Sequence, residues 1–91
     1  MFRNADKLFK KIGFEKVYES NIVVQYEKKN DKFNYIHQIE LIHKNSAKHL
    51  IMSCDKNLNG ENFNNAVGLT AYQARLCIKK MKEKGWKIVK L

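Results

Sequence analysis

The chain has no proline, only two cysteines and few acidic side chains among its 91 residues. It also has no apolar run near the roughly 20 residues that a transmembrane helix needs. Its first residues, Met1 to Asp6, lack the apolar segment of a secretion signal. These absences argue against a membrane protein or a secreted one, and predict a chain that stays in the cytoplasm of the cell that makes it.

The cysteines, Cys54 and Cys77, are single and far apart in the sequence. A small secreted scaffold would carry a larger, closely spaced set. We therefore expect a reducing compartment and two buried thiols. Cys77 falls on the apolar face of a predicted helix and Cys54 ends a predicted core strand, so neither is a good candidate nucleophile. Because no nucleophile elbow, phosphate-binding glycine loop or catalytic carboxylate pair is present either, we expect no enzyme activity and no small-molecule substrate.

The final helix, residues 69–86, has the clearest local signals. Thr70 and Gln73 form a capping box at its start, and Gly85 provides the left-handed residue that ends it. Trp86 is then placed to pack back on Met81. The expected buried face follows helical spacing: Ala74, Cys77, Ile78 and Met81.

A shorter helix is predicted at residues 5–12. Asn4 can cap it, Gly13 can end it, and Phe14 can fold back on Phe9. Its apolar positions repeat the same spacing: Ala5, Leu8, Phe9 and Ile12.

Between the helices, alternating apolar and polar residues predict strands at 21–28, from 33 to about 43, and at 48–54. Residues 15–20 fit either a further strand or an extended lead-in, and 55–68 read as a polar loop. Short polar turns between the strands favour an antiparallel meander.

This order, α-β-β-β-α, predicts one compact α+β domain over residues 1–91. Its antiparallel sheet has three to four strands, and both helices pack on one face because each has a single apolar side. A hydrophobic content of 44% is sufficient for such a core. The opposite face of the sheet is expected to show Asn34, Gln38 and Glu40.

Two patterns resemble metal sites. Asp55 to Gly60 matches the first half of a calcium loop, but position twelve is Ala66 where a glutamate is needed. His37 and His43 lie on one strand but roughly 20 Å apart, too far to share a zinc ion. A turn and ordinary half-buried histidines explain these residues better, so we predict no metal and no cofactor.

Positive charge is concentrated at the end of the chain. The net charge is +9, and residues 69–91 carry seven basic side chains and one acidic one. Arg75, Lys79 and Lys82 form a stripe at helical spacing. The predicted partner-binding residues are this stripe and its flanking lysines: Arg75, Lys79, Lys80, Lys82, Lys84 and Lys87.

Such a stripe favours an anionic partner, either nucleic acid or an acidic protein surface. The alternative is that these charges only keep the domain soluble. A single arginine makes base-specific recognition poor. Tyr72 and Trp86 border the stripe, but cap and core packing explain them better than stacking on bases.

Two segments also carry a resemblance to a known group of proteins. Leu8 to Val17 is similar to the opening of many small accessory proteins of phages and prophages of low-GC Gram-positive bacteria. The end, with Leu69-Thr70, Ala74, Ile78 to Met81 and Gly85-Trp86, is similar to their usual ending. The long 55–68 loop and the basic final helix depart from that pattern.

The resemblance implies an accessory phage product that acts stoichiometrically on host machinery, including as an anti-CRISPR or other anti-defence inhibitor. We therefore expect a non-catalytic protein that blocks a host defence or nucleic-acid-handling protein by occlusion, since a chain of +9 is a poor mimic of DNA. The alternative is direct, weakly sequence-specific binding of DNA or RNA through phosphate contacts.

Overall fold

The computed structural model describes residues 4–30, 32, 34–45, 48–57 and 65–88. In chain order the helices and strands are α1 (Ala5–Lys11), β1 (Glu15–Glu19), β2 (Val23–Asn30), β3 (Tyr35–Ile42), β4 (Leu50–Asn57), β5 (Asn65–Ala66) and α2 (Ala71–Glu83).

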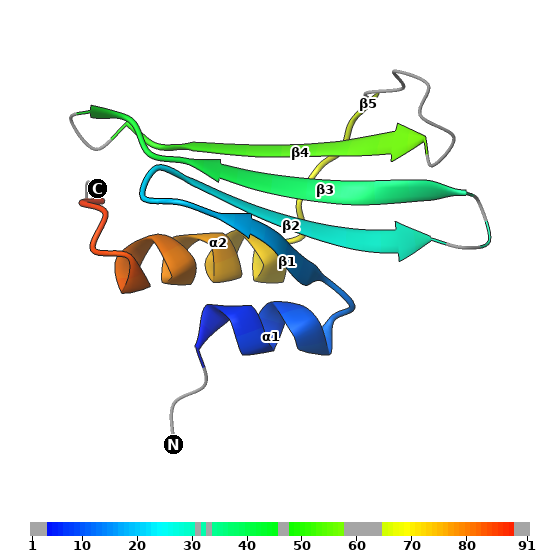
Figure 1. Ribbon diagram of the computed structural model, residues 1–91, viewed down its shortest axis with the longest axis horizontal. Helices are drawn as coiled ribbons and strands as arrows, with labels where there is room; N and C mark the ends of the chain where they lie inside the picture. The colour runs from blue at the N-terminus through cyan, green and yellow to red at the C-terminus, as the bar shows by residue number, and fades with distance from the viewer. Residues whose placement is uncertain (1–3, 31, 33, 46–47, 58–64, 89–91) are drawn as a thin grey trace.

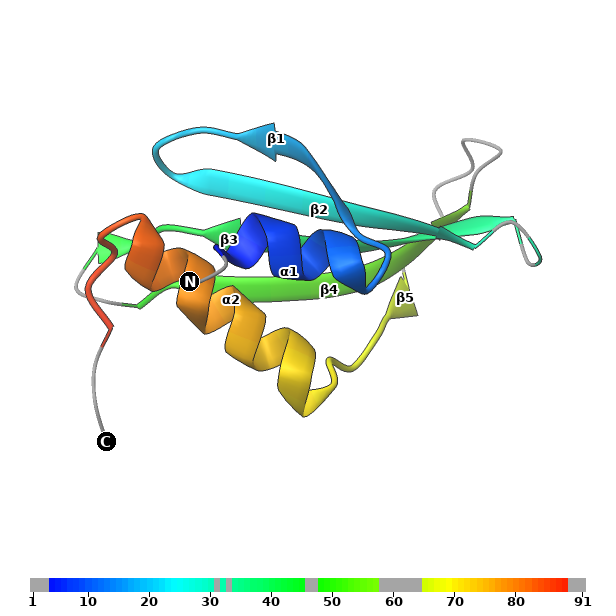
Figure 2. The ribbon, with the colours of Figure 1, turned by 90° about the horizontal axis from the view of Figure 1, so that it is seen from below.

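The strands form one antiparallel meander in the spatial order β1-β2-β3-β4-β5 (Figure 1). Both helices cover the same face of this sheet, which is plain when the molecule is seen from the helix side (Figure 2). The predicted α+β domain is therefore confirmed.

The strand count exceeds the prediction because the segment left open at 15–20 is a strand and part of the predicted loop is a strand too. Glu15–Glu19 pairs with β2 as a true strand. The predicted loop 55–68 is partly wrong, since Asp55 to Asn57 continue β4 and Asn65–Ala66 form β5. Residues 58–64 of that loop lie outside the described residues, and with them much of the calcium-like pattern.

The helix ends follow the predicted capping chemistry. The Asn4 side chain accepts a hydrogen bond from the Lys7 amide at 2.9 Å. The Thr70 hydroxyl and the Gln73 side chain each accept a hydrogen bond from the other's backbone amide at 3.0 Å. Gly13 and Gly85 have φ of +95° and +75°, which side chains other than glycine rarely adopt.

The core lies between the helices and the sheet and is built around aromatic rings. Phe9 of α1 stacks on Tyr26 of β2 with ring centroids 4.0 Å apart, and Phe14 meets the Phe9 ring edge-on at 5.8 Å. These contacts fix α1 against β2. The buried cluster is Phe9, Phe14, Val24, Tyr26, Ile39, Leu41, Leu76, Cys77, Met81 and Trp86.

The rotation of α2 differs from the prediction. Cys77 and Met81 are buried as expected, but Ala74 and Ile78 are only half-buried. Leu76 and Lys80 take the remaining buried positions. The apolar pattern alone could not show this, because it treats a lysine as a surface residue.

The outer face of the sheet, which no helix of the described chain covers, also needs a correction. Gln38 lies on this face yet is 7% exposed, because it sits in the central strand and donates to Glu27. Asn34 is in the turn before β3 with φ of +57°, not in a strand. Glu40 is on the outer face as predicted, and accepts a hydrogen bond from Gln25.

The two thiols lie in different environments. Cys77 is buried, and that burial raises the pKa of its thiol to about 12. Cys54, opposite Gln38, is half-buried on the outer face. The expectation of two buried thiols is therefore correct only for Cys77.

We predict that Met81→Ala lowers the free energy of unfolding by about 2–5 kcal/mol, because it leaves a cavity among packed side chains. Met81 is 2% exposed, whereas Met52 on β4 is 52% exposed and serves as the matched control. Urea unfolding of both variants checks this. Equal losses for Met81→Ala and Met52→Ala would contradict the described packing of α2.

Candidate functional site

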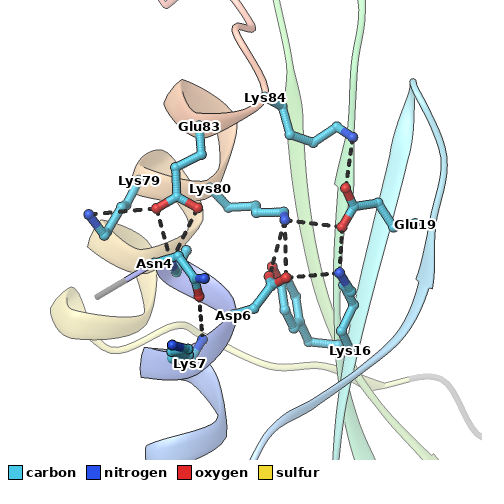
Figure 3. A network of polar contacts seen from close by, with 11 residues as sticks. Asn4, Asp6, Lys7, Lys16, Glu19, Lys79, Lys80, Glu83 and Lys84 are labelled. Carbon is cyan, nitrogen blue, oxygen red and sulfur yellow. Dashed lines mark hydrogen bonds and ion pairs between the residues drawn. The ribbon is translucent and has the colours of Figure 1, made fainter. Parts of the chain in front are cut away.

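Lys80, one of the predicted partner-binding residues, is the buried centre of an ion network (Figure 3). Its side chain is 8% exposed, and its Nζ lies 3.1 Å from Asp6 Oδ1 and 3.0 Å from Glu19 Oε1. Asp6 belongs to α1 and Glu19 to β1. A single α2 lysine therefore joins the helices to the edge of the sheet.

Lys16 and Tyr26 also belong to this network. The Lys16 Nζ is 2.8 Å from both Asp6 Oδ2 and Glu19 Oε1. The Tyr26 hydroxyl donates to Asp6 Oδ1 at 2.5 Å. Each carboxylate thus has several donors, which is how partly buried charges are stabilised.

The network shifts the pKa values of its members. The hydrogen bond from Lys16, with those from Lys80 and Lys84, lowers the pKa of Glu19 to about 2. Burial raises the pKa of Asp6, but the hydrogen bonds from Lys16, Tyr26 and Lys80 outweigh it and the net pKa is lowered. Burial and the bond to Asp6 raise the pKa of Tyr26. Both carboxyls are therefore ionised at neutral pH.

Lys84 is also occupied within the fold. Its Nζ lies 3.1 Å from Glu19 Oε2, and its side chain is 14% exposed. The same Nζ lies 5.9 Å from the centre of the Trp86 ring. Lys80 and Lys84 are therefore both engaged by carboxylates of the same chain, and their role in partner binding stays a prediction.

Glu83, the one acidic residue of the final helix, caps α1. Its two carboxylate oxygens accept the Ala5 amide at 3.2 and 3.0 Å. Lys79 lies 3.6 Å from the same carboxylate. A negative group at a helix N-terminus is favourable, so this contact helps to hold α1 against α2.

The remaining cations of α2 line a shallow groove on its solvent side, with a volume of about 720 Å³. Ala74 and Ile78, the half-buried residues that the periodicity misplaced, provide its apolar part. Arg75 and Lys82 are exposed, and Lys79 is partly exposed. The lining residues are Ala74, Arg75, Ile78, Lys79, Lys82 and Glu83. We call this surface the α2 groove.

Lys87 has an exposed side chain, but its carbonyl is held by a histidine cluster that the sequence reasoning missed. His49 Nε2 donates to the Lys87 carbonyl at 2.7 Å, so His49 Nδ1 accepts the Lys44 amide at 3.2 Å. The His43 and Trp86 rings stack at 5.0 Å, and His43 and His49 stack at 4.7 Å. The predicted turn after residue 43 could have indicated this cluster, because a turn brings His43 and His49, at the ends of two neighbouring strands, close together.

Trp86 and Tyr72, the two aromatic residues that border the cationic stripe, differ in exposure. Trp86 is 6% exposed and belongs to the core, which confirms the packing interpretation. Tyr72 is 44% exposed on α2. In the described ranges, no three His, Cys, Asp or Glu side chains lie close enough together to hold a metal ion.

Comparison with known proteins gives no match to a protein-family model, a curated protein or a solved structure. Neither helix in the described part of the chain has the length and apolarity needed to cross a bilayer.

We predict that Lys80→Met lowers the free energy of unfolding by about 1–3 kcal/mol, because the carboxylates of Asp6 and Glu19 lose a charged donor. Methionine keeps most of the aliphatic stem. Lys82→Met on the exposed side of α2 is the matched control and should change stability little. Urea unfolding measures both. Equal free energies of unfolding for the two variants would show that the ion network does not stabilise the fold.

Acid should weaken the same network. The folded-state pKa of Glu19 lies below its ordinary 4.5, at about 2, so its stabilising effect is complete above pH 4.5 and is lost as pH falls toward 2. Asp6, whose pKa is also lowered, acts in the same direction. Urea midpoints measured across this pH range should fall, and Glu19→Gln should flatten the fall. An identical pH dependence in wild type and Glu19→Gln would contradict this.

Proposed function

We propose that this chain is a non-catalytic binding protein whose α2 groove docks on an acidic, partly apolar protein surface and blocks it by occlusion. The observation that carries the proposal is the composition of that groove. Ala74 and Ile78 offer apolar contact, while Arg75, Lys79 and Lys82 provide positive charge beside it. Interfaces combine an apolar centre with a charged rim in this manner.

The target class follows from the resemblance to phage accessory proteins. A host nucleic-acid-handling or defence protein, with a CRISPR effector as the type example, is the proposed partner. Occlusion agrees with the charge, since a chain of +9 attracts acidic surfaces and does not imitate nucleic acid. The high pKa of the Cys77 thiol supports a binding role over covalent catalysis, because a nucleophilic cysteine acts as its thiolate.

A second candidate is direct, weakly sequence-specific binding of DNA or RNA. The observation in its favour is that α1 also presents exposed lysines, including Lys7 and Lys11, on the helix side of the molecule. Against it, Lys80 and Lys84 form ion pairs within the fold and Trp86 is buried. Fewer phosphate contacts mean weaker binding and a shallower salt dependence.

We predict that Arg75→Glu/Lys82→Glu abolishes partner binding without unfolding the chain, since both side chains are exposed. Lys79 is left unchanged because it contacts Glu83. The matched control is Lys44→Glu/Lys48→Glu, which makes the same charge change at exposed positions outside the α2 groove. The tagged variants are compared in pull-downs from a Gram-positive host lysate, with and without nuclease.

The proposal expects a complex that survives nuclease, is lost in the α2 variant and is kept in the control. The captured protein should also lose activity when the wild-type chain is added. Binding that disappears on nuclease treatment would instead support direct nucleic-acid binding. Equal loss in both double variants would show that net charge, and not the α2 groove, determines binding.

A further inference from the structure

The ring of His49 joins two segments that are far apart in the sequence. His49 lies in the connection between β3 and β4, beside the chain that follows α2 (Figure 2). On one side its Nε2 lies 2.7 Å from the Lys87 carbonyl oxygen, and on the other its Nδ1 lies 3.2 Å from the Lys44 amide nitrogen. One side chain therefore holds the end of the described chain on the β3–β4 connection.

The backbone groups on either side fix the protonation state of this ring. A carbonyl can only accept, so His49 Nε2 carries a hydrogen, and an amide can only donate, so His49 Nδ1 carries none. His43 Nδ1 lies 3.2 Å from His49 Nδ1 and is then the donor of this pair. His49 is therefore neutral, and two donors share its one ring acceptor.

A protonated His49 does not fit this arrangement. A hydrogen on Nδ1 would face the Lys44 amide and the His43 ring N–H, and both donors would lose their acceptor. The Nε2 hydrogen would stay, so the contact with the Lys87 carbonyl could persist. Protonation therefore breaks the bridge on the side of the β3–β4 connection.

The charged groups around the cluster do not offset this loss. Within the described ranges, neither His43 nor His49 forms an ion pair with a carboxylate. The Trp86 ring lies 5.4 Å from the His49 ring, and Lys84 Nζ lies 5.9 Å from the Trp86 ring while it pairs with Glu19. The charged residues that flank the cluster in the chain are Lys44, Lys48, Lys84 and Lys87.

We propose that His49 is an acid-sensitive latch, which holds the chain after α2 on the β3–β4 connection while it is neutral and releases it when protonated. Histidine is the side chain that takes up a proton between about pH 8 and 5. Trp86, which is buried against His43 and His49, becomes more exposed when the latch opens. The latch is a conformational switch at the end of the sheet.

The wild-type chain tests this directly. Trp86 is the only tryptophan, so its fluorescence reports on this cluster alone. Between about pH 8 and 5 its emission maximum should move to longer wavelength. The protection of the Lys44 amide against hydrogen exchange should fall about tenfold, as expected for the loss of a hydrogen bond. NMR correlation of the His49 ring nitrogens should show the Nε2–H tautomer at pH 8.

Two results with the wild type would overturn the proposal. One is an Nδ1–H tautomer of His49 at pH 8, which is incompatible with the described hydrogen bonds. The other is a His49 ring that takes up its proton while the Trp86 emission maximum and the Lys44 protection stay constant. Neither measurement depends on the folding of a variant.

Variants then identify the titrating ring. His49→Gln keeps an N–H that can reach the Lys87 carbonyl but does not titrate in this range, so it should abolish both changes. The matched control is His37→Gln. Burial lowers the pKa of His37, so this ring also gains a proton in acid, but it bonds Ser53 outside the cluster. Both changes should persist in this control.

His43→Gln separates the two stacked rings. Changes that persist in His49→Gln and vanish in His43→Gln would assign the proton to His43 and overturn the proposal. The latch is independent of the proposed function, so Arg75→Glu/Lys82→Glu should leave the pH response of Trp86 unchanged. It also differs from the acid response of Glu19, which begins only below pH 4.5.

Discussion

The ion pairs of Lys80 with Asp6 and Glu19 are the constraint on which the rest of the structure depends. They connect α2 to α1 and to β1, segments that are distant in sequence, through the most buried lysine of the network. Burying a lysine is favourable only where carboxylates meet it, so the network also fixes the rotation of α2. With Lys80 turned inward, Ala74 and Ile78 stay half-buried, and both line the α2 groove. The candidate site is therefore a consequence of the buried charge.

Most of the fold could be predicted because its signals are local. Asn4, Thr70, Gly13 and Gly85 act on their own helix ends, and the alternation in β2 to β4 acts within single strands. Where the sequence misled, distant contacts decided the outcome. Asp6 lies 74 residues from Lys80, and no local pattern pairs them. Likewise Gln38 is buried on the outer face only because neighbouring strands surround it.

The candidate site could be predicted in part for the same reason. Helical spacing places Arg75, Lys79 and Lys82 together whatever the tertiary structure is, and they do line one groove. A count of charges, however, cannot tell a lysine that faces solvent from one that faces a carboxylate. Lys84 was assigned to partner binding, yet its ammonium pairs with Glu19 inside the fold. Intramolecular carboxylates therefore offset part of the excess charge of the final helix.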